Sequence, residues 1–535
     1  MWRMAAAIVL LSEVMLSGHP QLPARDRPTS RETATAAISG RVVAADSNEP
    51  LRNARVALGG APSSVAPMFT GNDGRFAFRG LPSGRYTVSA RKAGYASTTF
   101  GQRRPDSPPL PIELDAGAAF ANCDLRMPRS AAISGRIVDE FGEPMELAIV
   151  QALRVSDRAR FPTAVSTATA ATDDLGDYRL GGLPAGTYIV SAATPTPGPR
   201  HRHSYYPGVP AAVQAQRIVL QAGDERSATD FGLVPGGLGK LTLSFVDPKG
   251  EPVNAVAIVF NMALTERMSN TAPLVGSVVT PTLEPGDLSI FARSPEGLVG
   301  SLPVTMGSDD ASMVMPLTKG GRITGRVVGE DGPLPRDAAL YVEGLPDLLS
   351  AGGLLSPGNL SWSGRVTDTA TFELNELIGP RHLTVRPAMP GASWFVTAIT
   401  HEGRNLLDRT LDFKGGEVVS GVQVVVSNRG GTITGTAAAG DGTPAGDYFV
   451  VVFPDDASSP ARLHRLLRVA RSNQNGRFTI EHAPPGKYFA VALADIDGVT
   501  TPFPVSQDLD RFRAQAVPLT VTDRQTTTLT LTLVP

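Results

Sequence analysis

A short motif recurs along the chain and constrains its fold more than any other feature. Residues 72–95 read NDGRFAFRGLPSGRYTVSARKAGY, in which Phe76 and Phe78 alternate with other residues before a GLPSG turn. Tyr86 and Val88 alternate in the same way after the turn. Alternation of period two on both sides of a Gly/Pro turn predicts two adjacent antiparallel strands. A phosphate-binding loop would need a helix after its glycines, and no helical period follows.

Copies of this hairpin occur at intervals of about one small domain. Clear copies cover residues 173–193 and 473–492, and weaker copies cover residues 282–297 and 370–387. The interval is longer than the repeat of about 20–50 residues that builds solenoids. The spacing therefore predicts an array of about five domains in a chain of 535 residues.

Strand and turn signals between the hairpins predict an all-β chain of tandem antiparallel β-sandwiches, of the Ig-like or prealbumin-like kind. Short alternating runs recur at about ten-residue spacing, with Gly and Pro between them. One stretch, residues 460–472, has a helical period. The expected divisions are a signal peptide and Pro/Thr-rich linker at 1–36 and five β-sandwich modules at 37–128, 131–235, 237–318, 320–428 and 430–535.

The first module resembles a known domain family. Its ISGRVV strand, Pro-containing turn, NDGRF strand, LPSGRY turn and final KAGY are similar, in that order, to the carboxypeptidase regulatory-like domain. Residues 131–235 carry the same pattern without the final Lys-Ala-Gly-Tyr, and residues 430–535 keep the central hairpin. The resemblance implies a transthyretin-like, carbohydrate-binding-like β-sandwich. It implies little about chemistry, because such a domain is an accessory to the protein that carries it.

Composition excludes some classes of partner and indicates a location. The net charge is −2 with both signs interspersed, which leaves no basic footprint for nucleic acid. Cys123 is the one cysteine, so no intrachain disulfide can form. The N-terminal MWRMAAAIVLLSEVMLSG has an arginine and a short apolar run, typical of a signal peptide although Glu13 interrupts it. No run is long enough for a transmembrane helix. We therefore expect a secreted, periplasmic or cell-envelope protein of bacterial type.

Searches for catalytic and metal-binding patterns give no candidate that outweighs a structural explanation. His401 and Glu402 begin HEGRN, without the second histidine that a zinc-peptidase helix needs. His201 and His203 lack a third ligand nearby. The acidic TDDLGDY at 172–178 lacks the ligand spacing of a calcium loop, and a turn explains it. We expect no enzyme activity, no cofactor and no metal.

Glycan binding is the sharpest functional hypothesis from the residues. Sugar rings stack on exposed aromatic faces. Tyr205 and Tyr206 lie in HRHSYYPGVP, a long insertion of the second module, and Trp362 and Trp394 are further candidates. The alternative is that such rings pack beneath their loops. We thus expect a non-catalytic binding array for a polysaccharide or an envelope protein, with a purely structural spacer or adhesin-like protein as the alternative and an unrecognised hydrolase as a weaker one. The sequence does not indicate the oligomeric state.

Overall fold

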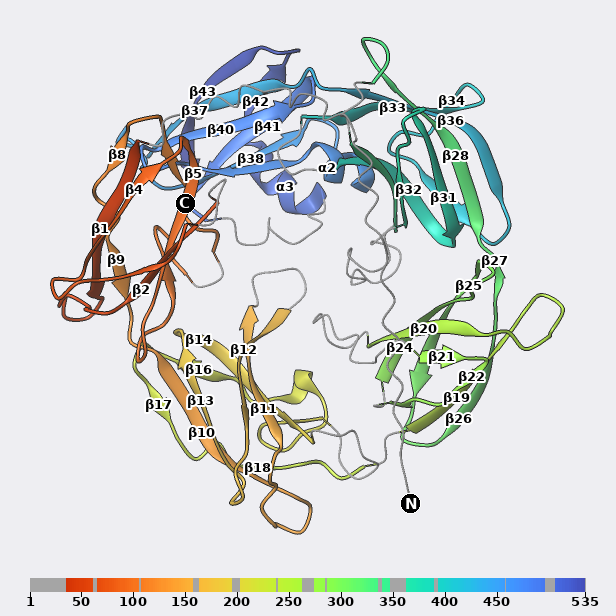
Figure 1. Cartoon of the computed structure of the whole chain (residues 1–535), viewed down its shortest axis with the longest axis horizontal. Helices are drawn as coiled ribbons and strands as arrows, with labels where there is room; N and C mark the ends of the chain where they lie inside the picture. The colour runs from red at the N-terminus through yellow and green to blue at the C-terminus, as the bar shows by residue number, and fades with distance from the viewer. Residues whose placement is uncertain are drawn as a thin grey trace, which may run out of the picture.

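The five modules follow one another around a ring, and the last lies against the first (Figure 1). The computed structural model describes residues 35–60, 65–104, 107–156, 163–194, 203–236, 239–261, 274–283, 286–334, 339–346, 362–388, 393–457, 459–495 and 506–534. The signal peptide expected at residues 1–36 lies almost wholly outside the described residues. No helix in the described part is long and apolar enough to cross a membrane.

The first module is a sandwich of two sheets. Its strands are β1 (Ala36–Ala44), β2 (Arg55–Gly59), β3 (Met68–Phe69), β4 (Arg75–Leu81), β5 (Gly84–Arg91), β6 (Thr98–Thr99), β7 (Ile112–Leu114), β8 (Ala119–Phe120) and β9 (Leu125–Met127). One sheet has the order β4-β1-β8, with β9 also on β1, and the other has the order β3-β2-β5-β6, with β7 also on β5. The predicted hairpin is β4–β5, and its two strands belong to opposite sheets. Phe76, Phe78 and Tyr86 all point into the core between them.

The second module repeats this plan. Its elements are β10 (Ala131–Val138), β11 (Ile149–Ser156), β12 (Thr163–Ala171), β13 (Asp177–Leu183), β14 (Gly186–Ala193), β15 (Ser204–Tyr205), the 3-10 helix η1 (Ala212–Gln214), β16 (Ile218–Leu220), β17 (Glu225–Arg226) and β18 (Phe231–Gly232). The sheets are β13-β10-β17, with β18 on β10, and β12-β11-β14-β15, with β16 on β14.

The third and fourth modules vary the plan. The third contains β19 (Gly239–Val246), β20 (Ala255–Asn261), β21 (Leu274–Gly276), β22 (Val278–Val279), β23 (Thr282–Leu283), β24 (Gly286–Arg293), β25 (Leu298–Met306), β26 (Ala311–Pro316) and β27 (Thr318–Lys319). The fourth contains β28 (Gly321–Gly329), β29 (Leu340–Pro346), β30 (Trp362–Arg365), β31 (Thr371–Leu377), β32 (Gly379–Pro387), β33 (Phe395–His401), β34 (Arg404–Asn405), β35 (Thr410–Phe413) and β36 (Val418–Ser427). Each again has two sheets around one core.

The fifth module adds two helices. Its elements are β37 (Gly431–Ala438), β38 (Phe449–Pro454), α2 (Pro460–Leu466), β39 (Arg468–Arg471), β40 (Arg477–Ala483), β41 (Gly486–Leu493), α3 (Ser506–Arg513), β42 (Val517–Val521) and β43 (Thr526–Val534). The helix expected over 460–472 ends at Leu466, and the remaining residues form β39 instead. Both helices lie on the inner side of the ring (Figure 1). Their residues Leu463 and Leu509 cover the face of β38 that is turned away from the core of the module, which explains why β38 is buried on both faces.

The predicted all-β fold class is confirmed, and the structure adds one feature to it. In every module the first strand runs parallel to a strand at or near the end of the module, as β1 does with β8 and β9, β19 with β26, and β37 with β43. In the first module a Cβ on Gly40 would lie 2.0 Å from the carbonyl oxygen of Cys123, so only glycine lets the last segment approach. Gly135, Gly325 and Gly435 meet the same obstruction. The third module has Leu243 at this position, fully buried.

A tyrosine hydrogen bond explains the L-P-x-G-x-Y motif. The hydroxyl groups of Tyr86, Tyr188 and Tyr488 each donate to the carbonyl oxygen of the proline four residues earlier, at 2.7 Å. Each of these tyrosines is at most 2% exposed, so the bond supplies an acceptor for a hydroxyl group that burial would otherwise leave without a hydrogen bond. Burial raises the pKa of Tyr188 to about 12. The motif therefore fixes the hairpin between the two sheets.

Candidate functional site

The tyrosines singled out in the second module do not form an open platform. Tyr205 is 3% exposed and packs on Leu153 and Ile189, on the outer face of the β11–β14 sheet. His203 stacks on its ring at 5.1 Å between centroids. We therefore correct the expectation that Tyr205 presents a free face to a sugar: the insertion folds back and covers the ring. Tyr206 is half-buried, with its edge against Phe231 at 6.0 Å.

The structure places some of the candidate tryptophans and histidines and leaves others outside the described residues. Trp362 begins β30 and pairs through its backbone with Gly344, and its side chain lies outside the described residues. Trp394 is half-buried against the core of the fourth module. His201 lies outside the described residues. Within the described ranges, no group of three or more His, Cys, Asp or Glu could hold a metal ion.

The acidic turn and the lone cysteine have local structural explanations. The Asp173 carboxylate accepts hydrogen bonds from the backbone N–H groups of Leu175 and Asp177, at 3.0 and 2.8 Å, which makes residues 173–177 a carboxylate-capped turn. Cys123 is fully buried in the first core, and burial raises the pKa of its thiol. Neither group is arranged for catalysis.

One segment of the fifth module, residues 459–471, makes polar contacts with two other modules, and we call it the arginine segment. Ser459 caps α2 by accepting from the backbone N–H of Arg462, and Pro460 occupies the first turn. Arginines then recur every third residue, as Arg462, Arg465, Arg468 and Arg471, through α2 and into β39. The segment contacts both neighbours of its module in the ring.

On one side the arginine segment binds the fourth module. The guanidinium group of Arg465 donates to both carboxylate oxygens of Asp408, at 2.8 and 2.7 Å. Both side chains are only 14% exposed. The Ser459 hydroxyl donates to the carbonyl oxygen of Asp408 at 3.1 Å. A two-bond pair of this kind fixes orientation as well as distance.

On the other side Arg471 joins the fifth module to the first. Its guanidinium group donates to both oxygens of Asp447 at 2.8 Å, and to the backbone carbonyls of Gly101 and Pro108 in the first module. The Arg471 side chain is 4% exposed and lies over the Phe449 ring at 5.2 Å. The buried Arg471 guanidinium group thus makes two hydrogen bonds within its own module and two across the interface.

Further bonds surround this contact. Arg103 of the first module donates to the Asp447 carboxylate at 2.8 Å, to its carbonyl at 2.8 Å and to the Ala494 carbonyl at 3.0 Å. Arg104 forms an ion pair with Asp495. Glu113 exchanges two bonds with the Gln474 side chain, through its N–H at 3.0 Å and its carbonyl at 2.7 Å. The paired residues are more than 340 positions apart in the sequence, so this interface closes the ring.

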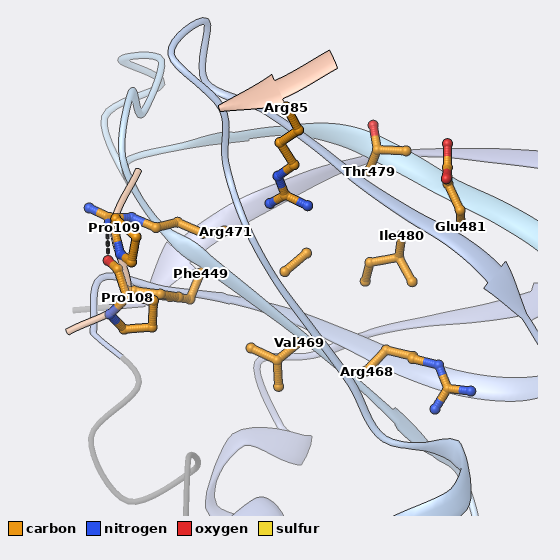
Figure 2. A pocket seen from close by; sticks show the side chains of 11 residues that line it. Arg85, Pro108, Pro109, Phe449, Arg468, Val469, Arg471, Thr479, Ile480 and Glu481 are labelled. Carbon is orange, nitrogen blue, oxygen red and sulfur yellow. Dashed lines mark hydrogen bonds between the residues drawn. The ribbon is translucent and has the colours of Figure 1, made fainter. Parts of the chain in front are cut away.

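Two cavities flank the arginine segment. Toward the first module, a pocket of about 390 Å³ is lined by Arg85, Pro108 and Pro109 of the first module and by residues of β39 and β40 (Figure 2). Toward the fourth module, a cleft of about 580 Å³ is lined by Asp408, Arg409 and Asn405 on one side and by Arg462 and Lys487 on the other. Both volumes fall in the range of small-molecule sites. Burial lowers the pKa of Arg468, which lines the first of these cavities.

The sequence alone pointed to residues 460–472 only as a helix. The three-residue spacing of arginines was a visible signal, but nothing local identifies Asp408, Asp447 or Gly101 as their partners. The fold of the fifth module brings Asp447 to Arg471, the contact with the fourth module brings Asp408 to Arg465, and the closure of the ring brings Gly101 to Arg471. Tyr205 and Tyr206, by contrast, pack within the second module and contribute nothing to this junction.

Comparison with solved structures finds bacterial proteins that include pilins. The Bacillus anthracis TIE protein is 9% identical with a TM-score of 0.16, over 75% of this chain and 72% of that chain. The minor pilin GBS52 of Streptococcus agalactiae is 11% identical with a TM-score of 0.22, over 38% and 96%. The shaft pilin SpaA of Lactobacillus rhamnosus GG is 15% identical with a TM-score of 0.17, over 38% and 98%. At these TM-scores we draw no conclusion about function.

Comparison with family models and curated proteins gives a narrower result. No curated protein matches the chain. The model of the carboxypeptidase regulatory-like domain matches residues 37–119 and 132–233. These stretches hold the hairpin, the proline–tyrosine bond and the close-approach glycine described above. The first and second modules of the ring are therefore tandem carboxypeptidase regulatory-like domains.

Proposed function

We propose that the chain is a non-catalytic interaction scaffold, exported to the bacterial cell envelope, that holds five β-sandwiches in a closed ring and binds its partners at loops and junctions between modules. The observation that carries the proposal is the polar interface between the first and last modules, centred on Arg471. A buried, fully bonded arginine requires matching groups on both surfaces, so the contact is specific.

Ring closure argues against a plain spacer. A spacer gains reach by keeping its ends apart, whereas here the first and last modules touch and the reach of the chain is reduced. The closed form brings residues of distant modules together and creates shared cavities, as at the first–fifth and fourth–fifth junctions. Shared cavities favour a binding role over a purely mechanical one.

The partner class expected from the sequence, a polysaccharide or an envelope protein, remains part of this proposal. Tyr206, at the edge of the second module, is the remaining aromatic candidate there for a sugar contact, because Tyr205 is covered. Arg409, Asn405 and Asp408 in the fourth–fifth cleft offer the planar polar groups that sugar hydroxyls pair with.

Binding of the purified full chain to an array of bacterial envelope polysaccharides, and crosslinking to envelope proteins, tests the proposal. We expect saturable binding of at least one component, and loss of a glycan component in Tyr206→Ala or Asn405→Ala. Phe69→Ala removes an aromatic ring that is 60% exposed in the first module and serves as the matched control. Absence of any saturable partner would support the spacer instead. Shortening of a bound polysaccharide, measured by size-exclusion chromatography, would refute the non-catalytic role.

A further inference from the structure

The pocket between the first and fifth modules combines unmatched positive charge with an apolar wall. It opens at the corner where β39 and β40 meet, and the first module covers it with Arg85 from β5 and with Pro108 and Pro109. Figure 2 shows the guanidinium group of Arg85 pointing toward the space between Phe449, Val469 and Ile480. Its volume of about 390 Å³ suits a small molecule or one residue of a larger one.

Cations outnumber anions in the lining. Arg85, Arg468 and Arg471 face Glu481 as the one carboxylate of the lining. The Arg471 guanidinium group already donates to Asp447 and to two carbonyl groups of the first module. Arg468 donates to the backbone carbonyls of Arg465 and Leu467, at 2.8 and 2.9 Å, and its bonds include no carboxylate. Among the described residues the guanidinium group of Arg85 has no hydrogen-bond acceptor. A concave surface with this excess of one sign attracts an anion.

The walls indicate which kind of anion. Pro108 and Pro109 form one side, and Val469 on β39 is 42% exposed. Ile480 closes the far side. A bare inorganic anion would leave these groups against water, whereas an anion with a branched apolar body would cover them and gain the burial of apolar area. Arginine guanidinium groups pair most favourably with the two oxygens of a carboxylate.

We infer that this pocket binds an organic carboxylate with a branched apolar body, of the kind that the C-terminal residue of a peptide presents. The Arg85 guanidinium pairs with the carboxylate, and the Pro108, Pro109 and Val469 side chains contact the body. The inference rests on the proposed interaction function and names a ligand class for one of its junctions. A carboxylate sugar is the other source of the same charge, but it offers less apolar surface to these walls.

Binding at this pocket also strengthens the closed ring. Because both modules line the pocket, the complete site exists only when the first and fifth modules are docked. A ligand that needs both surfaces binds the closed form alone, so at a free concentration 100 times its Kd it shifts the closing equilibrium by about 100-fold. The pocket thus couples capture of a partner terminus to the shape of the whole chain.

Isothermal titration of the full chain tests the assignment with four probes: N-acetyl-leucine, its neutral amide, glucuronate and inorganic phosphate. We expect N-acetyl-leucine to bind with a Kd of about 1 mM, as befits a fragment. The amide, glucuronate and phosphate should each bind at least about 10-fold more weakly, since an ionic hydrogen bond or the apolar contact is missing. If the amide bound as tightly as N-acetyl-leucine, the assignment of a carboxylate would be wrong. If phosphate bound as tightly, the assignment of an apolar body would be wrong. Tighter binding of glucuronate would overturn the peptide source.

Variants separate this inference from the wider proposal. Arg85→Gln removes the unpaired guanidinium group without touching any bond of the closure, and should weaken N-acetyl-leucine about 10-fold or more. Arg79→Gln, another exposed arginine of the first module, should leave the affinity unchanged. An unchanged affinity in Arg85→Gln would refute the site. If the envelope array shows a partner but no probe binds, the pocket assignment fails and the scaffold function stands. If neither binds, both fail.

Discussion

Replacing Arg471 by alanine should open the ring. The change removes two bonds to backbone carbonyls of the first module and leaves Asp447 with Arg103 as its remaining cation. Removing one partner of a buried ion pair costs about 3–5 kcal/mol. Because Arg103 still pairs with Asp447, we expect the lower end, about 3 kcal/mol, which corresponds to a shift of more than about 100-fold toward the open form. Arg103→Ala breaks three bonds from the opposite side and should act in the same direction.

Small-angle X-ray scattering measures the consequence. A module of 100 residues has a radius of gyration of about 13 Å, and the longest strands of these modules set a spacing between module centres of about 30 Å. Five such bodies on a closed ring give about 29 Å overall, and five in a line give about 44 Å. We expect the wild-type chain near the first value and Arg471→Ala well above it, with an unchanged far-ultraviolet circular dichroism spectrum.

A matched control isolates ring closure from general effects of losing an arginine. Arg75 forms an ion pair with Asp73 at 3.4 Å, and its side chain is 76% exposed. Such a pair is worth at most about 1 kcal/mol, so Arg75→Ala should leave the radius of gyration unchanged. A wild-type radius near that of the line, or an Arg471→Ala and Arg103→Ala double variant that keeps the wild-type radius, would refute the argument for closure through Arg471.

Two further predictions concern the modules themselves. Gly135→Ala should destabilise the second module by about 1–3 kcal/mol, because the added Cβ would lie 2.3 Å from the Thr229 carbonyl oxygen. The control Gly181→Ala should change the stability little, because a Cβ there meets nothing within 4 Å. Equal thermal unfolding temperatures of the two variants would contradict the close-approach explanation. The folded state should lose stability between pH 10 and about pH 12, since burial raises the pKa of Tyr188 to about 12 and the unfolded chain releases that proton first; a flat denaturant midpoint over this range would contradict it.

The fold was largely predictable because its signals are local. The β4–β5 hairpin has a pattern of alternating residues on both sides of one Gly/Pro turn, and the later copies have the same pattern. The parallel pairing of first and last strands was not predictable, since it depends on where a distant segment returns, although Gly40 and its equivalents mark the place. The helix predicted over 460–472 ends early because residues 468–471 form β39, which pairs with β38 and places Arg471 opposite Phe449. Sheet pairing therefore overrode the helical pattern of this segment.

The candidate site was hardly predictable, because its partners are far apart in sequence. An exposed tyrosine and a tyrosine buried beneath its own loop have the same one-letter signature, and only the packing of Tyr205 on Leu153 and Ile189 distinguishes them. Likewise, Arg471 reads as one arginine among many. Its role depends on the carbonyl groups of Gly101 and Pro108, which carry no side-chain signal at all.

Comparison of equivalent positions shows how a repeated module acquires a specific junction. In three modules a buried hydroxyl accepts from the backbone N–H of the strand that follows the first turn: Thr70 from Ala54, Thr172 from Ala148 and Ser472 from Tyr448. The two residues that immediately precede the members of each pair are therefore equivalent between modules. They are Asn53 and Phe69 in the first module, Leu147 and Ala171 in the second, and Asp447 and Arg471 in the fifth.

The shared hydroxyl builds the module, and the two positions beside it are free to vary at its surface. Leu147 is 55% exposed and Phe69 is 60% exposed, so neither is held by its own module. In the fifth module the same two positions carry an acid and a base that bind each other and the first module. Ring closure therefore required changes at surface positions that cost the sandwich little, which is why the motif that identifies the fold says nothing about the contact that shapes the molecule.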